Sequence, residues 1–294
     1  MKKIGLIGAR GYTGRELLAR LQAHTGVELV VAASSSAAGA RVPGFDLDYV
    51  APSPSLLRGL DGVFLALPNG TSAPYVAAAA ADTAVVDLSA DHRFDDAFAY
   101  GLVERQRARL RGHRRIANPG CYATAMQLAL GPITGVLSGP PVVFGVSGYS
   151  GAGKTPSRRN DPDVLRDNLL PYALLGHIHE REARHHLGIE LYFHPHVAPH
   201  FRGITLTISC PVTSDNLRAH YAVYDDEPLV EVIDGIPEVR DIAYKDGVCI
   251  GGIEVKDGRA VIVATIDNLN KGASVQAMQN MNLALGFDEY AGVL

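Results

Sequence analysis

The chain has 294 residues, enough for two domains, and its 47% hydrophobic and 20% charged residues are typical of a globular protein. The net charge of −4 excludes the global basic field with which proteins recruit nucleic acid or an anionic membrane surface. Its three cysteines have no paired spacing, and no apolar stretch reaches the roughly 18 residues of a membrane helix. We therefore expect a cytoplasmic protein without a disulfide framework and without a nucleic-acid or membrane partner.

Apolar runs alternate with helical segments in the first third of the chain. Leu17, Leu18 and Leu21 lie on one face of a predicted helix over Thr13–His24, and an alanine-rich helix is expected near Ser72–Ala81. Runs with the composition of buried strands occupy residues 3–7, 27–33, 62–67, 84–88 and 115–117. This βαβ rhythm predicts a Rossmann-type, doubly wound parallel sheet of the α/β class.

A glycine-rich turn, GARGYTG, joins the first strand to the first helix. Its glycines allow a tight turn and let a pyrophosphate approach the backbone at the helix N-terminus. The spacing is GxxGxxG instead of GxGxxG, so a plain strand–turn–helix junction is the alternative. Its place in the first βαβ unit favours a nucleotide site, and a further contact is expected after the third predicted strand. The predicted contacts are Gly8, Arg10, Gly11, Tyr12, Thr13, Gly14 and Pro68.

The end of the second predicted strand indicates which nicotinamide cofactor binds. An NAD site usually has an acid there, which binds the ribose 2′-hydroxyl. Here the strand runs into three serines, and Arg41 follows. Hydroxyls with a nearby cation suit a 2′-phosphate, which a carboxylate would repel. Ser34, Ser36 and Arg41 therefore predict NADP, with a flexible polar loop as the alternative.

Cys121 lies between a turn and a predicted helix over Ala123–Leu130. The dipole and free N–H groups of a helix N-terminus favour the thiolate, so we expect a pKa below the usual value of about 8.5. Cys210 and Cys249 lie inside strand patterns and are expected to be buried core residues. Cys121 is therefore the predicted nucleophile.

The pattern changes after Cys121. Predicted strands are separated by long segments, and hydroxyl side chains alternate with apolar ones along Thr205–Cys210, which indicates one solvated face. We expect an α+β second domain over 121–268 with a mixed, mostly antiparallel sheet. A last helix over 271–285 should return to the first domain, which comprises 1–120 and 269–294. The strands are predicted at 141–147, 205–210, 248–255 and 259–266.

A glycine- and hydroxyl-rich loop follows the first strand of the second domain. Gly148–Thr155 satisfies GxxxxGKT, so a P-loop phosphotransferase stays open as an alternative. Against it, Pro156 is a poor helix continuation and no acid-terminated strand for magnesium follows. An anion-binding nest for a substrate phosphate, with Ser147, Gly148 and Ser150, is the preferred interpretation.

Histidines are dense between His177 and His200, but they lack HExxH spacing and we expect no metal site. Arg202 precedes Gly203 and a predicted strand. Its planar fork suits a bidentate clamp on a substrate carboxylate or phosphate, with a surface arginine as the alternative.

The segment Ile116–Pro132 (IANPGCYATAMQLALGP) resembles the active-site signature of the N-acetyl-γ-glutamyl-phosphate reductases of arginine biosynthesis, relatives of aspartate-semialdehyde dehydrogenase. Other segments match in the right order along nearly the whole chain. They are GARGYTG (8–14), DLSADHRF (87–94), YGLVE (100–104), SGYSGAGK (147–154), GHIH (176–179), HPHVAPHFRGI (194–204) and DNLNKGASVQAMQNMN (267–282).

The resemblance implies a covalent mechanism. The thiolate of Cys121 would attack an acyl phosphate, phosphate would leave, and NADPH would reduce the thioester to a semialdehyde. It also implies a histidine of the GHIH segment as acid/base; His177 is preferred and His179 stays open. Arg93 and His179 are expected substrate contacts, and Asn268 is expected near the nicotinamide.

Two residues depart from the family pattern, Asn69 in place of a frequent histidine and Val275 in place of a frequent glycine, and both affect the cofactor pocket. The resemblance implies a small acyl-phosphate substrate and a homodimer or homotetramer. A reductase of the related lysine route, acting on a carrier-bound aminoadipyl phosphate, and a non-catalytic NADPH-binding module are the alternatives. The acyl group on the substrate amine stays open.

Overall fold

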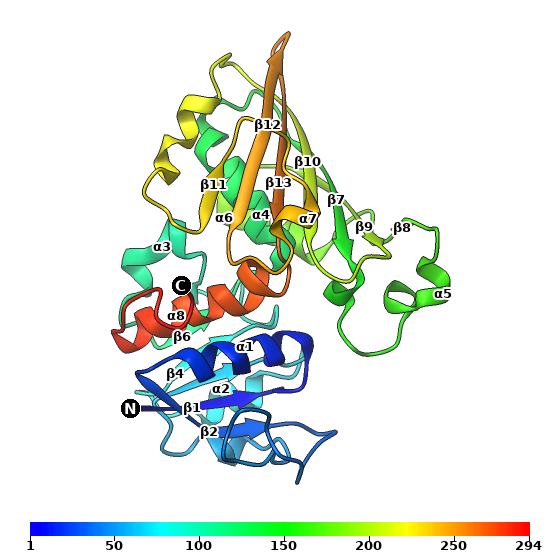
Figure 1. The fold of residues 1–294 in the computed structure, drawn as a ribbon. Helices are drawn as coiled ribbons and strands as arrows, with labels where there is room; N and C mark the ends of the chain where they lie inside the picture. Colours follow the sequence, from blue (N-terminus) through cyan, green and yellow to red (C-terminus); the bar gives the residue numbers. More distant parts are fainter. The chain divides into compact units, whose positions relative to one another are not determined.

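A computed structural model describes all 294 residues, which form two compact units (Figure 1). Unit 1 comprises Met1–Pro119 and Ala273–Leu294, and unit 2 comprises Gly120–Gly272. The domain boundaries expected from the sequence, after residues 120 and 268, lie close to these limits. None of the helices has both the length and the apolar character that a membrane crossing requires.

Unit 1 contains a six-stranded sheet in the order β2-β1-β3-β4-β6-β5, and every neighbouring pair is parallel. This confirms the predicted Rossmann-type sheet. Only the two-residue β5 lacked a sequence signal, because so short a run has no periodicity. The strands are β1 (Lys2–Ile7), β2 (Val27–Ala33), β3 (Gly62–Leu65), β4 (Ala84–Asp87), β5 (Ala99–Tyr100) and β6 (Arg115–Ala117).

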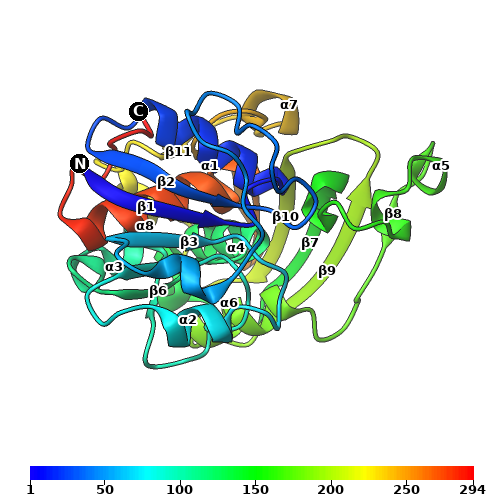
Figure 2. The same cartoon turned by 90° about the horizontal axis from the view of Figure 1, so that it is seen from below.

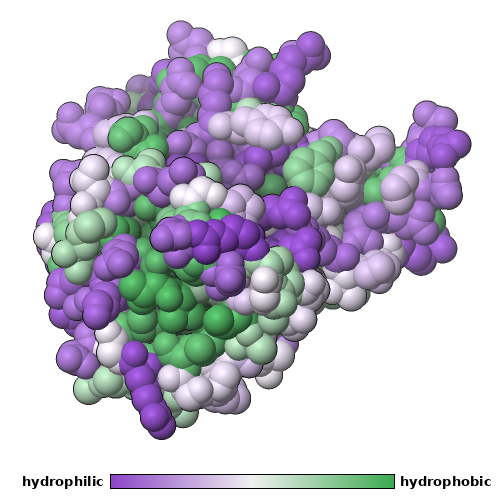
Figure 3. All heavy atoms as spheres, turned by 60° about the horizontal axis from the view of Figure 1, so that its bottom comes forward, coloured by the Kyte–Doolittle hydropathy of each residue, from purple (hydrophilic) through white to green (hydrophobic).

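Helices cover both faces of this sheet (Figure 2). On one face α1 (Tyr12–Ala23) and α8 (Val275–Leu285) pack on the strands, and α3 (Val103–Leu110) packs on α8. The other face has a thinner cover, the single turn η1 (Pro54–Leu57) and the short α2 (Ala73–Ala78). Leu57 of this cover is buried, whereas Leu56, Tyr75 and Val76 are only partly buried. In the space-filling view, apolar side chains form a patch on the side of the molecule that is turned to the viewer (Figure 3).

Unit 2 contains a seven-stranded sheet in the order β11-β12-β13-β10-β7-β9-β8. The pairs β11–β12 and β7–β9 are parallel and the other four are antiparallel, which confirms the mixed, mostly antiparallel sheet. The strands are β7 (Val142–Gly148), β8 (Leu170–Pro171), β9 (Tyr192–Ala198), β10 (Ile204–Pro211), β11 (Val230–Val232), β12 (Val248–Lys256) and β13 (Arg259–Ile266).

The helix α4 (Cys121–Leu130) packs on β10 and β13 of this sheet, and α6 (Ile178–Leu187) packs on α4. The other face leaves Val142, Phe144 and Tyr192 between 40% and 46% exposed. The remaining short elements are η2 (Gly131–Val136), η3 (Tyr149–Ala152), η4 (Arg158–Asn160), α5 (Pro162–Leu165), η5 (Arg218–Tyr224) and α7 (Val239–Ile242).

The last helix begins later than the sequence predicts. A π-helical turn, η6 (Asn270–Ser274), precedes α8, so the α-helix starts at Val275 and not at Lys271. The cause is Asp267, whose carboxylate accepts the backbone N–H groups of Leu269 and Asn270 while its carbonyl accepts that of Gly272. These bonds widen the first turn, as is frequent at functional sites.

Candidate active site

Cys121 is the first residue of α4, and Gly120 is its extended N-cap. All other residues of α4 are buried, whereas Cys121 is only partly buried. The thiol therefore stands where the free N–H groups of the helix start favour an anion and where a substrate can reach it. Cys210 and Cys249 are buried, which confirms them as core residues, and burial raises the pKa of each to about 11.

Two contacts fix the turn before the thiol. The N–H of Gly120 donates to Oε1 of Glu182 at 2.9 Å, and Glu182 is fully buried on α6. A Cβ at Gly272 would lie 2.7 Å from the Cβ of Cys121, so only glycine fits there. A charge-assisted bond and a close backbone approach thus hold the candidate nucleophile. Sequence reasoning missed Glu182, because its partner is 62 residues away.

The two candidate histidines begin α6. His177 is the N-cap residue, and its Nδ1 accepts the N–H of His179 at 3.1 Å. The two imidazole rings lie 4.9 Å apart, and both lie within about 6 Å of the ring of Tyr122, the neighbour of Cys121. Burial, and then the charge of Arg159, lowers the pKa of His177 to about 4. At neutral pH the ring is therefore uncharged, and its proton is on Nε2 because Nδ1 is an acceptor.

A tyrosine and an arginine that carry no sequence motif join this cluster. The ring of Tyr172 lies 5.5 Å from that of His177, and the guanidinium of Arg159 lies 5.0 Å over the ring of Tyr172. Burial, and then the negative charge of the Cys121 thiolate, raises the pKa of Tyr172 to about 12, so the phenol stays protonated near the thiol. Arg159 lies in the single turn η4 and Tyr172 directly follows the two-residue β8, and both elements are too short for periodicity to give a signal.

The loop expected to bind phosphate is internally bonded. Oγ of Ser147 donates to the carbonyl of Gly148 at 2.8 Å, and Oγ of Ser150 accepts Nδ2 of Asn268 at 2.9 Å. Oδ1 of Asn268 in turn accepts the N–H of Gly203. No α-helix opens at the GKT of the motif, because the chain enters the short turn η4 instead. The P-loop alternative is therefore wrong, since that motif needs a helix N-terminus.

Arg202 is buried, so the alternative of a surface arginine is wrong. Its Nε and Nη2 donate to the two carboxylate oxygens of Asp267 at 2.6 and 2.9 Å, and Nη2 also donates to Asn270. The ring of Tyr244 lies 4.3 Å from the guanidinium carbon. The role of Arg202 in substrate binding stays a prediction. Its guanidinium would have to bind the substrate while it also donates to Asp267.

In unit 1 the glycine turn has the geometry of a nucleotide cradle. Gly8 has φ +88°, and a Cβ there would lie 2.1 Å from the carbonyl oxygen of Ala66. A Cβ at Gly14 would lie 2.4 Å from the carbonyl oxygen of Gly8. The turn thus needs glycine at both positions, whereas a Cβ at Gly11 would meet only ordinary contact. These residues fit a pyrophosphate at the N-terminus of α1.

The serine loop after β2 meets a different cation from the one expected. Nη1 of Arg10 donates to the carbonyl of Ser36 at 3.3 Å, and the hydroxyls of Ser34 and Ser36 lie 3.5 Å apart. Arg41 instead pairs with two aspartates, Asp46 and Asp48. Arg10 is therefore the better candidate for a charge on a 2′-phosphate.

The loops after β3 and β4 are bonded to each other. Oδ1 of Asn69, which follows Pro68, accepts the N–H of Ala90 at 2.9 Å. Arg93 is buried and donates to the carbonyls of Asn118 and Leu88, each at 3.0 Å. The departure at Asn69 thus supports the loop, and Val275 is fully buried in α8.

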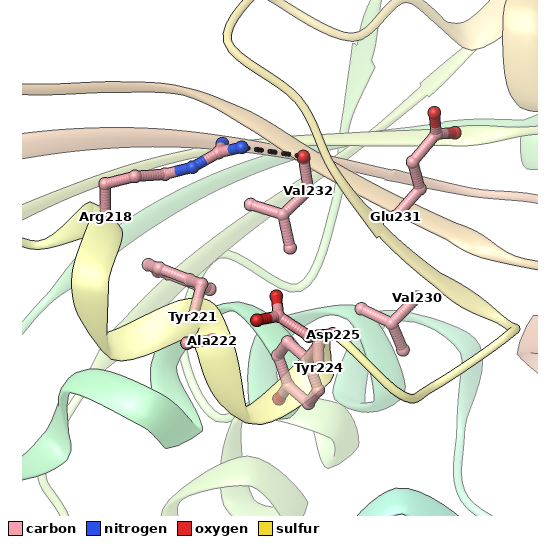
Figure 4. A pocket seen from close by; sticks show the side chains of 8 residues that line it. All are labelled: Arg218, Tyr221, Ala222, Tyr224, Asp225, Val230, Glu231 and Val232. Carbon is pink, nitrogen blue, oxygen red and sulfur yellow. Dashed lines mark hydrogen bonds between the residues drawn. The ribbon is translucent and has the colours of Figure 1, made fainter.

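No three His, Cys, Asp or Glu side chains are grouped closely enough to hold a metal ion. A pocket of about 420 Å³ lies between η5 and β11 (Figure 4). The hydroxyls of Tyr221 and Tyr224 at this pocket donate to the carbonyls of Ala129 and Leu128. It therefore lies at the end of α4 opposite the thiol. Arg218, its cation, donates to the carbonyls of Val232 and Ile233. The chemistry points to the surroundings of Cys121 instead.

The chain matches two family models. Residues 3–113 match the semialdehyde dehydrogenase NAD binding domain, and residues 121–268 match the semialdehyde dehydrogenase dimerisation domain.

Curated relatives match over almost the whole chain. N-acetyl-gamma-glutamyl-phosphate reductase of Xanthomonas axonopodis pv. citri is 51% identical, with 99% of this chain and 98% of the relative covered. The enzyme of the same name from Stenotrophomonas maltophilia is 50% identical, with 99% and 97% covered. Among solved structures, aspartate semialdehyde dehydrogenase II of Vibrio cholerae has a TM-score of 0.81 at 19% identity, covering 97% of this chain and 98% of that one. This last likeness shows the fold.

Proposed function

Because the chain belongs to the N-acetyl-gamma-glutamyl-phosphate reductase family, we propose that it reduces N-acetyl-γ-glutamyl phosphate to N-acetylglutamate semialdehyde with NADPH and releases phosphate. The observation that carries this proposal is Cys121, the one partly exposed residue of an otherwise buried helix, located at that helix's N-terminus. A carboxylate resists hydride, and a thiol at this place offers a route through a thioester.

The reaction begins with attack of the Cys121 thiolate on the acyl carbon. A C–S bond forms, the bond from carbon to the phosphate oxygen breaks, and phosphate leaves with the electron pair. A nicotinamide, when bound, would supply the hydride that reduces the thioester, and the C–S bond would break as the aldehyde is released. His177, neutral with its proton on Nε2, can donate a hydrogen bond to the oxyanion formed at each step; the C=O bond then re-forms as the thiolate leaves on Cys121, with no net proton transfer from the ring.

The expected substrate contacts remain part of the proposal. They are Ser147, Gly148, Ser150, His179, Arg93 and Arg202. Hydrogen bonds within the protein hold the side chains of Ser147, Ser150, Arg93 and Arg202 in place, which supports a preorganised site. Arg202 in this role would orient the substrate from within its pair with Asp267.

For the cofactor we propose NADP. The cradle would be Gly8–Gly14 with Pro68, and Ser34, Ser36 and Arg10 would receive the 2′-phosphate. No acid stands at the end of β2, which supports NADP over NAD. Asn268 is also proposed to contact the cofactor, near the nicotinamide. Arg41 is a weaker candidate for the 2′-phosphate than Arg10, because its charge is already paired with Asp46 and Asp48.

We also propose that the chain forms a homodimer or homotetramer in the cytoplasm. The exposed apolar residues Val142, Phe144 and Tyr192 on the open face of the unit 2 sheet support self-association, since monomers rarely expose such a group.

The reverse reaction tests the function. Purified protein is mixed with N-acetylglutamate semialdehyde, NADP and inorganic phosphate, and NADPH formation is followed by absorbance. We expect NADPH formation that requires both the semialdehyde and phosphate. The N-succinyl analogue and carrier-bound aminoadipate semialdehyde serve as comparison substrates. The proposal would be refuted if N-acetylglutamate semialdehyde gave no NADPH, or if NADPH formed without added phosphate.

A further inference from the structure

Arg159 is an exposed arginine on a rigid turn. It lies in η4, where the side chain and backbone of Ser157 and the side chain of Asn160 form a capping box. Nδ2 of Asn160 donates to the carbonyls of Gly153 and Thr155, each at 2.8 Å. The turn that carries Arg159 is therefore fixed to the loop that follows β7.

Arg159 makes no ion pair within the protein, unlike most arginines of unit 2. Its guanidinium lies 5.0 Å over the ring of Tyr172, and Tyr172 lies near both His177 and the Cys121 thiol. The fork of Arg159 thus carries a positive charge that no carboxylate neutralises, and the ring of Tyr172 links it to His177 and to the charge of Cys121. Paired arginines of the same unit are Arg166, Arg184, Arg202, Arg218 and Arg240.

The reaction brings an anion to this place. The phosphoryl group is bonded to the carbon that the thiolate attacks, so it must lie within a few ångströms of the thiol, and it carries nearly two negative charges. His177 is uncharged at neutral pH, with a pKa of about 4, so it cannot balance them. A guanidinium offers parallel N–H donors that match two phosphoryl oxygens.

We propose that Arg159 binds the phosphoryl group of the acyl phosphate, and inorganic phosphate in the reverse reaction, with its guanidinium held against Tyr172. This inference rests on the proposed function and adds the residue that receives the leaving group. Contact with the ring, whose centre lies 5.0 Å from the guanidinium carbon, orients the fork, and no ion pair within the protein occupies it.

In the reverse reaction the two anionic groups enter on different substrates. Inorganic phosphate is one substrate, and the semialdehyde, which carries the carboxylate, is the other. Arg159→Ala should raise the KM for inorganic phosphate at least tenfold, while the KM for the semialdehyde changes less than about twofold. Arg159→Gln should behave like Arg159→Ala, and Arg159→Lys should recover part of the loss because it keeps the charge without the fork.

Arg158→Ala is the matched control, since this neighbouring exposed arginine has no ring under it, and its KM for phosphate should stay at the wild-type value. An unchanged KM for phosphate in Arg159→Ala would overturn the inference. So would a rise confined to the KM for the semialdehyde, which would assign Arg159 to the carboxylate. An inactive wild-type protein would instead refute the proposed function itself.

Discussion

Two polar regions of unit 2 use arginine in opposite ways. Around Arg202 the charge is matched inside the protein, by Asp267 and Asn270, and both members of the ion pair are buried. Around Arg159 the charge faces solvent over Tyr172 and has no carboxylate partner. A buried matched pair maintains structure, because losing either partner leaves an uncompensated charge. The cation on Tyr172, in contrast, has no partner charge in the protein and is available to a substrate anion. Substitutions around Arg159 and Cys121 should therefore reduce activity, whereas substitutions around Arg202 should reduce stability.

The largest loss is expected at the thiol itself. Cys121→Ser should lose nearly all reductase activity while remaining folded and binding NADPH, because a hydroxyl is a poor nucleophile and leaving group near neutral pH. Wild-type protein mixed with acyl phosphate in the absence of NADPH should release about one phosphate per site and form a thioester. Intact-mass and peptide measurements locate the adduct.

Iodoacetamide provides the control for that assignment. Cys210 and Cys249 are buried with a pKa of about 11 each, so labelling of the native protein should be confined to Cys121. A serine variant with ordinary turnover, or an acyl adduct on another residue, would contradict the covalent mechanism.

The next largest loss is expected at His177. His177→Asn should lower turnover by roughly 10²- to 10⁴-fold, the usual contribution of a positioned proton donor. Because burial and Arg159 lower the pKa of His177 to about 4, the ring gains a charge only as the pH falls toward 4. A pH profile of wild-type kcat/KM should therefore lack a limb near pH 6.5 from this group.

His179→Asn is the matched variant, because His179 lies two residues after His177 at the start of the same helix. It should cost less than His177→Asn. The reverse order would exchange the roles of the two histidines and leave Cys121 as the nucleophile unaffected.

Loss of the buried pair should affect stability before chemistry. Arg202→Ala should lower the free energy of unfolding by about 3–5 kcal/mol, because the Asp267 carboxylate stays buried without its partner. Denaturant unfolding measures this. Arg240→Ala, which breaks the exposed pair with Glu238, is the control and should cost less than about 1 kcal/mol. An unchanged stability of Arg202→Ala would contradict the structural role of the pair, and a substrate KM raised about tenfold would support the proposed substrate contact as well.

The smallest expected effect tests the same charge argument in unit 1. Ser34→Asp adds a carboxylate at the end of β2, where it should repel the 2′-phosphate and weaken NADPH binding by about tenfold. NADH, which lacks that phosphate, is the control ligand and should bind no more weakly than to wild type. Fluorescence titration measures both. Equal affinity of the wild-type protein for NADH and NADPH would contradict the NADP assignment.

Much of the candidate site was visible as local pattern. The turn before Cys121 is contiguous with the helix after it, and Gly8 and Gly14 lie in one short segment, so steric and dipole arguments apply without knowledge of the fold. The π-turn before Val275 was not visible, because it depends on the carboxylate of Asp267 capturing nearby N–H groups. Arg41 looked like the cofactor cation by proximity in sequence, yet its charge goes to Asp46 and Asp48.

The sequence by itself determined the two kinds of sheet, the glycine cradle and the thiol at a helix start, because periodicity, chirality and helix dipoles act over a few consecutive residues. Tertiary structure alone decided which charges are matched. Gly120 meets Glu182 across 62 residues, Arg202 meets Asp267 across 65, and Arg159 meets the ring of Tyr172. Burial then set the pKa of His177. Such partners depend on how distant segments pack, and the free energy of a charge depends on that packing more than on its neighbours in sequence.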